Sequence, residues 1–224
     1  AGDLLWVGAG ALGSHDGRVR LVFRDQVELL VPEPDPELAP TDPVAVALRD
    51  HLGARGASFW DDLVRAAADA GVGFEADAVL AALWDLVWAG EVTNDSFAPL
   101  RALLAGGGRR GPYVSRSRPR PGRLSRSGPP AAAGRWSLVA PLRLSPPGQS
   151  AASPTEVAHA RAGQLLERYG VLTREAALGE GTEGGFAGVY PVLTELETRG
   201  QVRRGYFVAG PGAAQFALAG AVDR

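Results

Sequence analysis

The first apolar runs of the chain are short and separated by turn residues, a pattern typical of β-strands. Three runs lie between residues 4 and 31, with the sequences LLWV, VRLVF and VELLV. Val, Leu and aromatic side chains dominate them. Five prolines between Pro32 and Pro43 then end the pattern. It predicts a β-strand segment over residues 1–35, which we interpret as a β-hairpin and part of a β-barrel module.

Beyond these prolines the apolar residues take the spacing of helices. The spacing predicts one helix beginning at Val44 and a second after an N-cap at Ser58. A third helix begins near Glu75 and ends at Gly90, in the position of a C-terminal glycine cap. The short extended segment EVTNDSF follows. We predict a first helical module over residues 41–104.

The same order of elements recurs in the second half of the chain. With a fixed offset of 110 residues, six residue pairs coincide: Val79 with Val189, Leu83 with Leu193, Leu86 with Leu196, Gly90 with Gly200, Val92 with Val202, and Phe97 with Phe207. Because each pair serves the same structural role, the repeat predicts duplication of one module, with the second copy over residues 137–224.

Three helices, a glycine and a two-stranded hairpin are the order of elements in a winged helix, a variant of the helix-turn-helix. The predicted fold class is therefore α+β, with tandem winged-helix modules after the β segment. Winged helices bind nucleic acids or other proteins, and the order of elements leaves both functions open.

Charge is distributed unevenly along the chain. Residues 1–104 hold 17 acids and 7 Arg, whereas residues 105–136 hold 8 Arg and no acid. The second stretch is also rich in Gly, Pro and Ser, which predicts a basic linker. Its Arg side chains could neutralise phosphates or merely keep a linker soluble. The candidate phosphate contacts in the linker are Arg109, Arg110, Arg116, Arg118, Arg120, Arg123 and Arg126.

Charge also discriminates between the two modules. The third helix and hairpin of the first carry five acids and no cation, so we predict that they do not face DNA. The second module offers nucleic-acid contacts at Arg174, Arg199, Arg203 and Arg204. Next to the last pair, Tyr206 or Phe207 could stack on a base. Trp84 and Trp88 of the first module either dock a neighbouring module or complete their own core.

Several classes of site are excluded or disfavoured. The chain has no Cys, which excludes disulfides and thiolate metal sites, and its three His have no metal-ligand spacing. The segment VGAGALG contains G-x-G-x-x-G, but an alternating strand follows it where a dinucleotide site needs a helix. No ATPase motif is present, so we expect no cofactor in this chain. No apolar run approaches the ~18 residues of a membrane span, and we expect a cytoplasmic protein.

The segments WVGAGALG, GRWSLV, LLERYGVLTREA, EGGFAGVYPVL, RRGYFVAGPGAAQFA and GAVD resemble the C-terminal region of the actinobacterial large helicase-related (Lhr) family. These are superfamily 2 DEAD/DEAH-type helicases. The resemblance covers nearly all of the chain and is densest from Gly134 to Asp223. The chain also lacks Met, and we expect it to be a fragment of a longer protein.

The resemblance implies a parent that is an ATP-dependent 3′-to-5′ DNA helicase connected with DNA repair, whose motor lies upstream and uses ATP and Mg. Its partners would be single-stranded DNA or an RNA:DNA hybrid. The family's C-terminal region is an array of winged helices with a β-barrel module. We therefore expect this chain to be a nucleic-acid-binding accessory region.

Two alternatives stay open, because some members' C-terminal regions are linked to glycosylase activity and self-association. The chain could be a base-excision module, or a structural array that forms a homo-oligomer. It lacks the Q-x-Q pair of the related crosslink-repair glycosylases, so no catalytic residue is carried over.

Overall fold

The computed structural model describes residues 3–13, 16–71, 75–106, 128–144, 151–182, 184–210 and 213–222. The chain divides into two compact units, and each has its own hydrophobic core. Unit 1 comprises Ala1–Val27 and Val31–Leu144, and unit 2 comprises Glu28–Leu30 and Ser145–Arg224.

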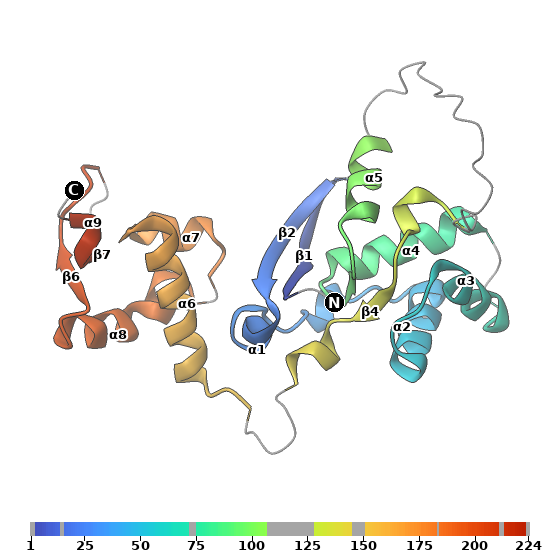
Figure 1. Cartoon of the computed structure of the whole chain (residues 1–224), viewed down its shortest axis with the longest axis horizontal. Coiled ribbons are helices and arrows are strands. Elements are labelled where there is room, and N and C mark those ends of the chain that lie inside the picture. The colour runs from blue at the N-terminus through green and yellow to red at the C-terminus, as the bar shows by residue number, and fades with distance from the viewer. Residues whose placement is uncertain are drawn as a thin grey trace. The chain divides into compact units, whose positions relative to one another are not determined.

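Unit 1 contains a pair of long strands and a group of helices with a second, smaller sheet (Figure 1). Its strands are β1 (Leu4–Gly13), β2 (Asp16–Phe23), β3 (Val92–Asn94) and β4 (Trp136–Leu138). Its helices are α2 (Pro43–Arg55), α3 (Trp60–Asp69), α4 (Ala76–Trp88) and α5 (Ala98–Gly106). The short helix α1 (Val27–Leu30) contributes residues to both units.

Strands β1 and β2 pair antiparallel and pack against α4. The register shifts between Gly8 and Ala11, so β1 carries a bulge, and Gly10 there has a φ of 104°. A Cβ on Gly8 would overlap the carbonyl oxygen of Val87 in α4, and one on Gly17 would overlap the ring of Trp88. The two glycines therefore allow close approach of the sheet to the helix.

The segment VELLV is not a strand, contrary to the prediction. A 3-10 turn at Arg24–Gln26 follows β2 directly, and the Arg24 N–H donates to the carbonyl of Asp3. One helical turn, α1, then buries Val27 and Val31. Because these residues are four apart, the run has the spacing of one helical turn as well as that of a strand. Short apolar runs do not distinguish the two.

Ser58 is not the N-cap of the second helix either. Its backbone exchanges two hydrogen bonds with Trp136, of 2.9 and 2.8 Å, so it acts as a short third strand beside β4. Helix α3 begins two residues later, and the carboxylate of Asp62 accepts a hydrogen bond from Phe59 N at 3.4 Å. The polar side chain at position 58 resembled a cap in sequence, but a buried sheet position uses it.

Strand β3 pairs with β4, 41 residues further along the chain. Trp136 in β4 is fully buried in the core of unit 1, and Val139 is buried too. Residues 128–144 therefore belong to unit 1, whereas the sequence predicted that a linker ends at residue 136 and the second module begins at 137. Composition did not reveal that a basic segment is followed by a strand of the preceding unit.

Unit 2 has the order of elements predicted for a winged helix. Its helices are α6 (Pro154–Tyr169), α7 (Arg174–Gly179), α8 (Gly185–Thr198) and α9 (Ala219–Val222). Its strands β5 (Val171–Leu172), β6 (Val202–Gly205) and β7 (Gln215–Leu218) form an antiparallel sheet with β7 in the middle. The Ser153 hydroxyl accepts the N–H of Glu156, whose carboxylate accepts the N–H of Ser153, so the predicted capping box starts α6.

The pairs that repeat at an offset of 110 occupy equivalent places in the two units. The four aliphatic pairs are buried in their respective cores, at Val79 and Val189, Leu83 and Leu193, Leu86 and Leu196, and Val92 and Val202. Gly90 and Gly200 both have positive φ, of 79° and 72°, directly after α4 and α8. Left-handed backbone favours glycine at these helix ends.

Candidate nucleic-acid interface

The surface to consider in unit 2 is α8 together with the wing, which we define as residues 202–218. Along the sequence from Gln201 to Val222 there are two Arg and no Asp or Glu. Gly200 ends α8 and turns the chain into β6, so helix and wing are continuous. Phosphate-binding surfaces need cations without nearby acids, and the wing meets that condition.

Arg203 and Arg204 are adjacent in β6, and both are exposed. The guanidinium carbon of Arg204 lies 5.9 Å from the ring centre of Tyr190 in α8 and 6.0 Å from that of Phe216 in β7. Cation–π attraction of this kind restricts the guanidinium without neutralising its charge. Since successive side chains of a strand alternate between faces, Arg203 points away from this aromatic pair.

Arg199 lies at the end of α8 and is partly compensated. Its Nε is 2.8 Å from Oε1 of Glu195, one helical turn earlier, and both side chains are more than half exposed. Exposed ion pairs are weak and are screened by salt. A phosphate could therefore compete for Arg199, although the middle of α8 is not basic, since Glu195 and Glu197 are its charged residues.

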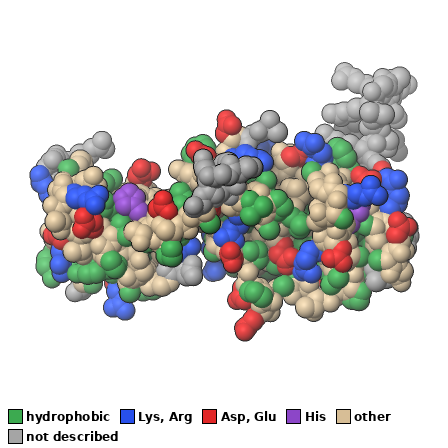
Figure 2. Space-filling view, turned by 90° about the horizontal axis from the view of Figure 1, so that it is seen from below, with side chains coloured by type: hydrophobic (Ala, Val, Ile, Leu, Met, Phe, Trp, Pro, Cys, Tyr) green, Lys and Arg blue, Asp and Glu red, His purple; other side chains and the backbone are tan. Residues whose placement is uncertain are grey.

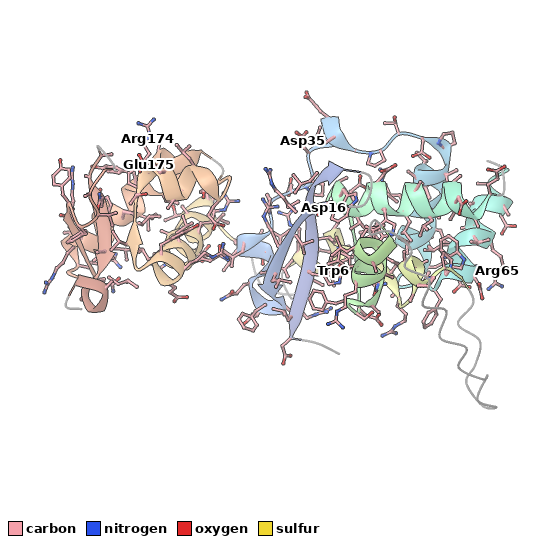
Figure 3. The ribbon with its side chains drawn as sticks, turned by 90° about the horizontal axis from the view of Figure 1, so that it is seen from above. Trp6, Asp16, Asp35, Arg65, Arg174 and Glu175 are labelled. Carbon is pink, nitrogen blue, oxygen red and sulfur yellow. The ribbon has the colours of Figure 1, made fainter. Side chains whose placement is uncertain are left out.

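Arg174 is separate from the other three. It begins α7, where Thr173 accepts the Ala176 N–H as the N-cap. Figure 3 shows Arg174 and Glu175 projecting outward from this helix. The structure thus places Arg199, Arg203 and Arg204 on the connection from α8 to the wing, and Arg174 on another helix. The seven linker Arg, from Arg109 to Arg126, lie outside the described residues.

The two aromatic candidates of the wing have different environments. Tyr206 is 79% exposed, whereas Phe207 is half-buried and packs against Gly205. Sequence reasoning missed Gln215, which is fully buried and bonds to the backbone of the wing. The available signal was a lone amide in the apolar run AAQFAL, where a buried polar side chain needs a partner.

Trp84 and Trp88 belong to the core of unit 1. Trp84 is 4% exposed, its Nε1–H donates to the carbonyl of Ala131 at 3.1 Å, and its ring lies 5.7 Å from that of Trp136. Figure 3 shows Trp6 of β1 directed into the same unit, and its ring lies 6.3 Å from that of Trp84. Both indoles are thus used inside the unit, where they also hold β1 and β2. Covered in this way, α4 does not present its apolar stripe to a partner.

The glycine-rich segment VGAGALG lies within β1 and leads into β2. It forms the bulge that packs on α4, so its glycines have a structural role rather than that of a pyrophosphate loop. In the part of the chain that the structure describes, no helix is long and apolar enough to cross a membrane.

A groove of about 610 Å³ lies in unit 1 between β1, residues 31–42 and the end of α4. Asp42 and Asp85 both line it. Burial raises the pKa of the Asp85 carboxyl above its ordinary value, and the negative charge of Asp42 raises it further. A groove with this charge repels phosphate. The visible face in Figure 2 shows acidic and basic side chains interspersed, so the charge preference is local to grooves and to the wing.

Known proteins resemble the chain in both units. A family model described as the winged-helix domain of large helicase-related protein matches residues 151–224. A relative from Mycolicibacterium smegmatis, named "Lhr helicase/ probable uracil glycosylase", is 41% identical over the whole chain. Another from Escherichia coli, named "Lhr helicase/uracil glycosylase", is 33% identical over the whole chain. The chain spans about 15% of the length of each relative. It therefore belongs to the large helicase-related (Lhr) family and corresponds to part of the C-terminal region of such a helicase.

Proposed function

We propose that this chain is a nucleic-acid-binding accessory region of an ATP-dependent helicase, with unit 2 as its binding module. The observation that carries the proposal is the wing, where Arg203 and Arg204 are exposed on a stretch of 22 residues without an acid. Arg forks match the oxygens of phosphate groups, so the wing suits a nucleic-acid backbone. Arg199, Arg174 and the linker Arg would add contacts of the same kind.

Unit 1, in this proposal, is a diverged second winged helix that supports unit 2 rather than binding phosphate. Ser58 bridges Trp136 in the way that Leu172 pairs with Phe216, which supports a common strand order. Two changes distinguish it from unit 2. Strands β1 and β2 cover α4, and 41 residues replace the short connection between the last two strands.

For the parent protein we propose 3′-to-5′ movement along DNA that is driven by ATP and Mg, with a role in DNA repair. The parent's motor would be a partner of this region in the same polypeptide, and single-stranded DNA or an RNA:DNA hybrid would be its nucleic acid. The family relation supports this proposal. No feature of the described residues favours base excision or self-association over nucleic-acid binding.

A salt series of binding titrations tests the proposal. The full chain is titrated against a labelled single-stranded DNA, and the logarithm of affinity is plotted against the logarithm of salt concentration. Each lost phosphate contact on a single strand lowers the slope by about 0.7. Arg203→Gln with Arg204→Gln should therefore reduce the slope by about 1.4 and weaken binding.

Arg65→Gln is the matched control, because Arg65 is an exposed Arg of unit 1 that pairs with Asp62 (Figure 3). This variant should leave both affinity and slope unchanged. Affinity that is independent of salt, or equal losses from the wing and control variants, would contradict the proposal. Far-UV circular dichroism establishes that each variant is folded.

A further inference from the structure

We propose that Tyr206 is a stacking platform for an unpaired base, so that the wing prefers single-stranded nucleic acid to duplex. This inference rests on the proposed function and specifies its substrate class. Base–aromatic stacking accepts any base, but it needs a base whose face is free. Bases of a duplex are already stacked on their neighbours, so a single protruding ring discriminates between the two forms.

The backbone on both sides of Tyr206 is fixed by one residue. Gly205 pairs with Gln215 in the β6–β7 ladder. Oε1 of Gln215 then accepts the N–H groups of Phe207 and Val208, both at 2.8 Å, and its Nε2 donates to the Val208 carbonyl at 2.8 Å. Because Gln215 is fully buried, water does not compete with these bonds.

The neighbouring ring turns inward while Tyr206 stays outside. A Cβ on Gly205 would lie 2.8 Å from the ring of Phe207, so the absence of a side chain there lets this ring fold back onto the strand. Tyr206 remains 79% exposed. Single exposed apolar residues are common on proteins. Here the exposed ring instead stands on a backbone held on both sides, which lowers the entropy lost when a base stacks on it.

Charge on the same face completes the site. Side chains two positions apart on a strand lie on one face, so Tyr206 follows Arg204. The Arg204 guanidinium is held over Tyr190 and Phe216 and keeps its charge. A base on Tyr206 would therefore have its own backbone phosphate within reach of a positioned cation. Alternating stacking and phosphate contacts are the usual features of single-strand binding surfaces.

The test compares the wild-type chain with Tyr206→Ala, Tyr206→Phe and Val208→Ala. The probes are a 12-mer oligo-dT with one central 2-aminopurine and the duplex of the same strand. Tyr206→Ala should bind the single strand about 5- to 150-fold more weakly, since stacking on one aromatic ring accounts for an effect of this size. The salt slope should not change, because no phosphate contact is lost. Quenching of 2-aminopurine, which reports stacking, should also be lost.

Tyr206→Phe keeps the ring and should bind like the wild type. Val208→Ala is the matched control, since this residue is 47% exposed on the same wing and bonds to Gln215 through its backbone. The stacking inference is wrong if Tyr206→Ala retains wild-type affinity, or if the wild type binds duplex as tightly as single strand. The proposed function fails by a separate result, namely wild-type binding that is absent or independent of salt.

Discussion

Gly8 and Gly17 determine at the residue scale how closely the β1–β2 sheet packs on α4. Both lack a Cβ where the backbone or a Trp ring of the helix occupies the space. In sequence, Gly8 belongs to a motif that resembles a nucleotide-binding loop, and only the following strand indicates otherwise. The packing requirement explains these glycines without a ligand.

Gly8→Ala should therefore destabilise unit 1. The added Cβ overlaps the Val87 carbonyl oxygen, which is backbone and does not move aside cheaply. We expect a loss of about 1–3 kcal/mol in the free energy of unfolding, measured by urea denaturation. Gly13→Ala in the same strand is the control, because nothing lies within 4 Å of its added Cβ. Equal stability of the two variants would contradict close packing at Gly8.

Asp85 gives unit 1 a pH-dependent penalty. Burial and the charge of Asp42 raise its pKa, so the folded state binds this proton more tightly than the unfolded state does. Ionising Asp85 therefore costs stability, and the cost is present at neutral pH. Asp85→Asn should raise the free energy of unfolding by less than about 1 kcal/mol near pH 7, since the carboxyl is largely exposed.

The gain from Asp85→Asn should shrink as the pH falls toward the ordinary carboxyl value of 3.8, because the wild-type group is then protonated in both states. Urea midpoints across that pH range measure it. Asp77→Asn on the same helix serves for comparison. Asp77 lies in the first turn, where the helix dipole favours an acid, so its removal should not stabilise the protein.

Helices α4 and α8 have equivalent places in two separate cores. Leu83 and Leu193 are both fully buried, each in the core of its own unit. Leu83→Ala should therefore destabilise unit 1 alone and Leu193→Ala unit 2 alone, each by about 2–5 kcal/mol. Hydrogen exchange read by mass spectrometry measures the two units in one sample. Loss of protection in both units from either variant would show that they unfold together.

The sequence predicted elements well where a residue pattern was long. The stripes of α4 and α8 span several turns and end at Gly90 and Gly200, so their periods and ends were readable. VELLV and Ser58 were misinterpreted because each is too short for its period or its cap to be distinctive. Strand β4 was missed since its partner lies 41 residues away, and strand pairing leaves no local signal.

Across the whole molecule, charge predicted the candidate interface better than shape did. The acid-free run around Arg203 and Arg204 was visible in sequence, but their environments were not. Which of Tyr206 and Phe207 is exposed depends on Gly205 and Gln215, which act through three-dimensional contacts. The fate of the Trp pair likewise required β1 and β2 to be placed on α4.

The distance between β3 and β4 also has a consequence for the order of folding. Nine residues separate β6 from β7, against 41 between β3 and β4, so closing the sheet of unit 1 costs about 1.3 kcal/mol more in chain entropy. Trp136, the last large side chain of that core, is also synthesised long after Trp6 and Trp84. A nascent chain should therefore carry an incomplete, aromatic-rich core until β4 leaves the ribosome, when a chaperone would have most to bind.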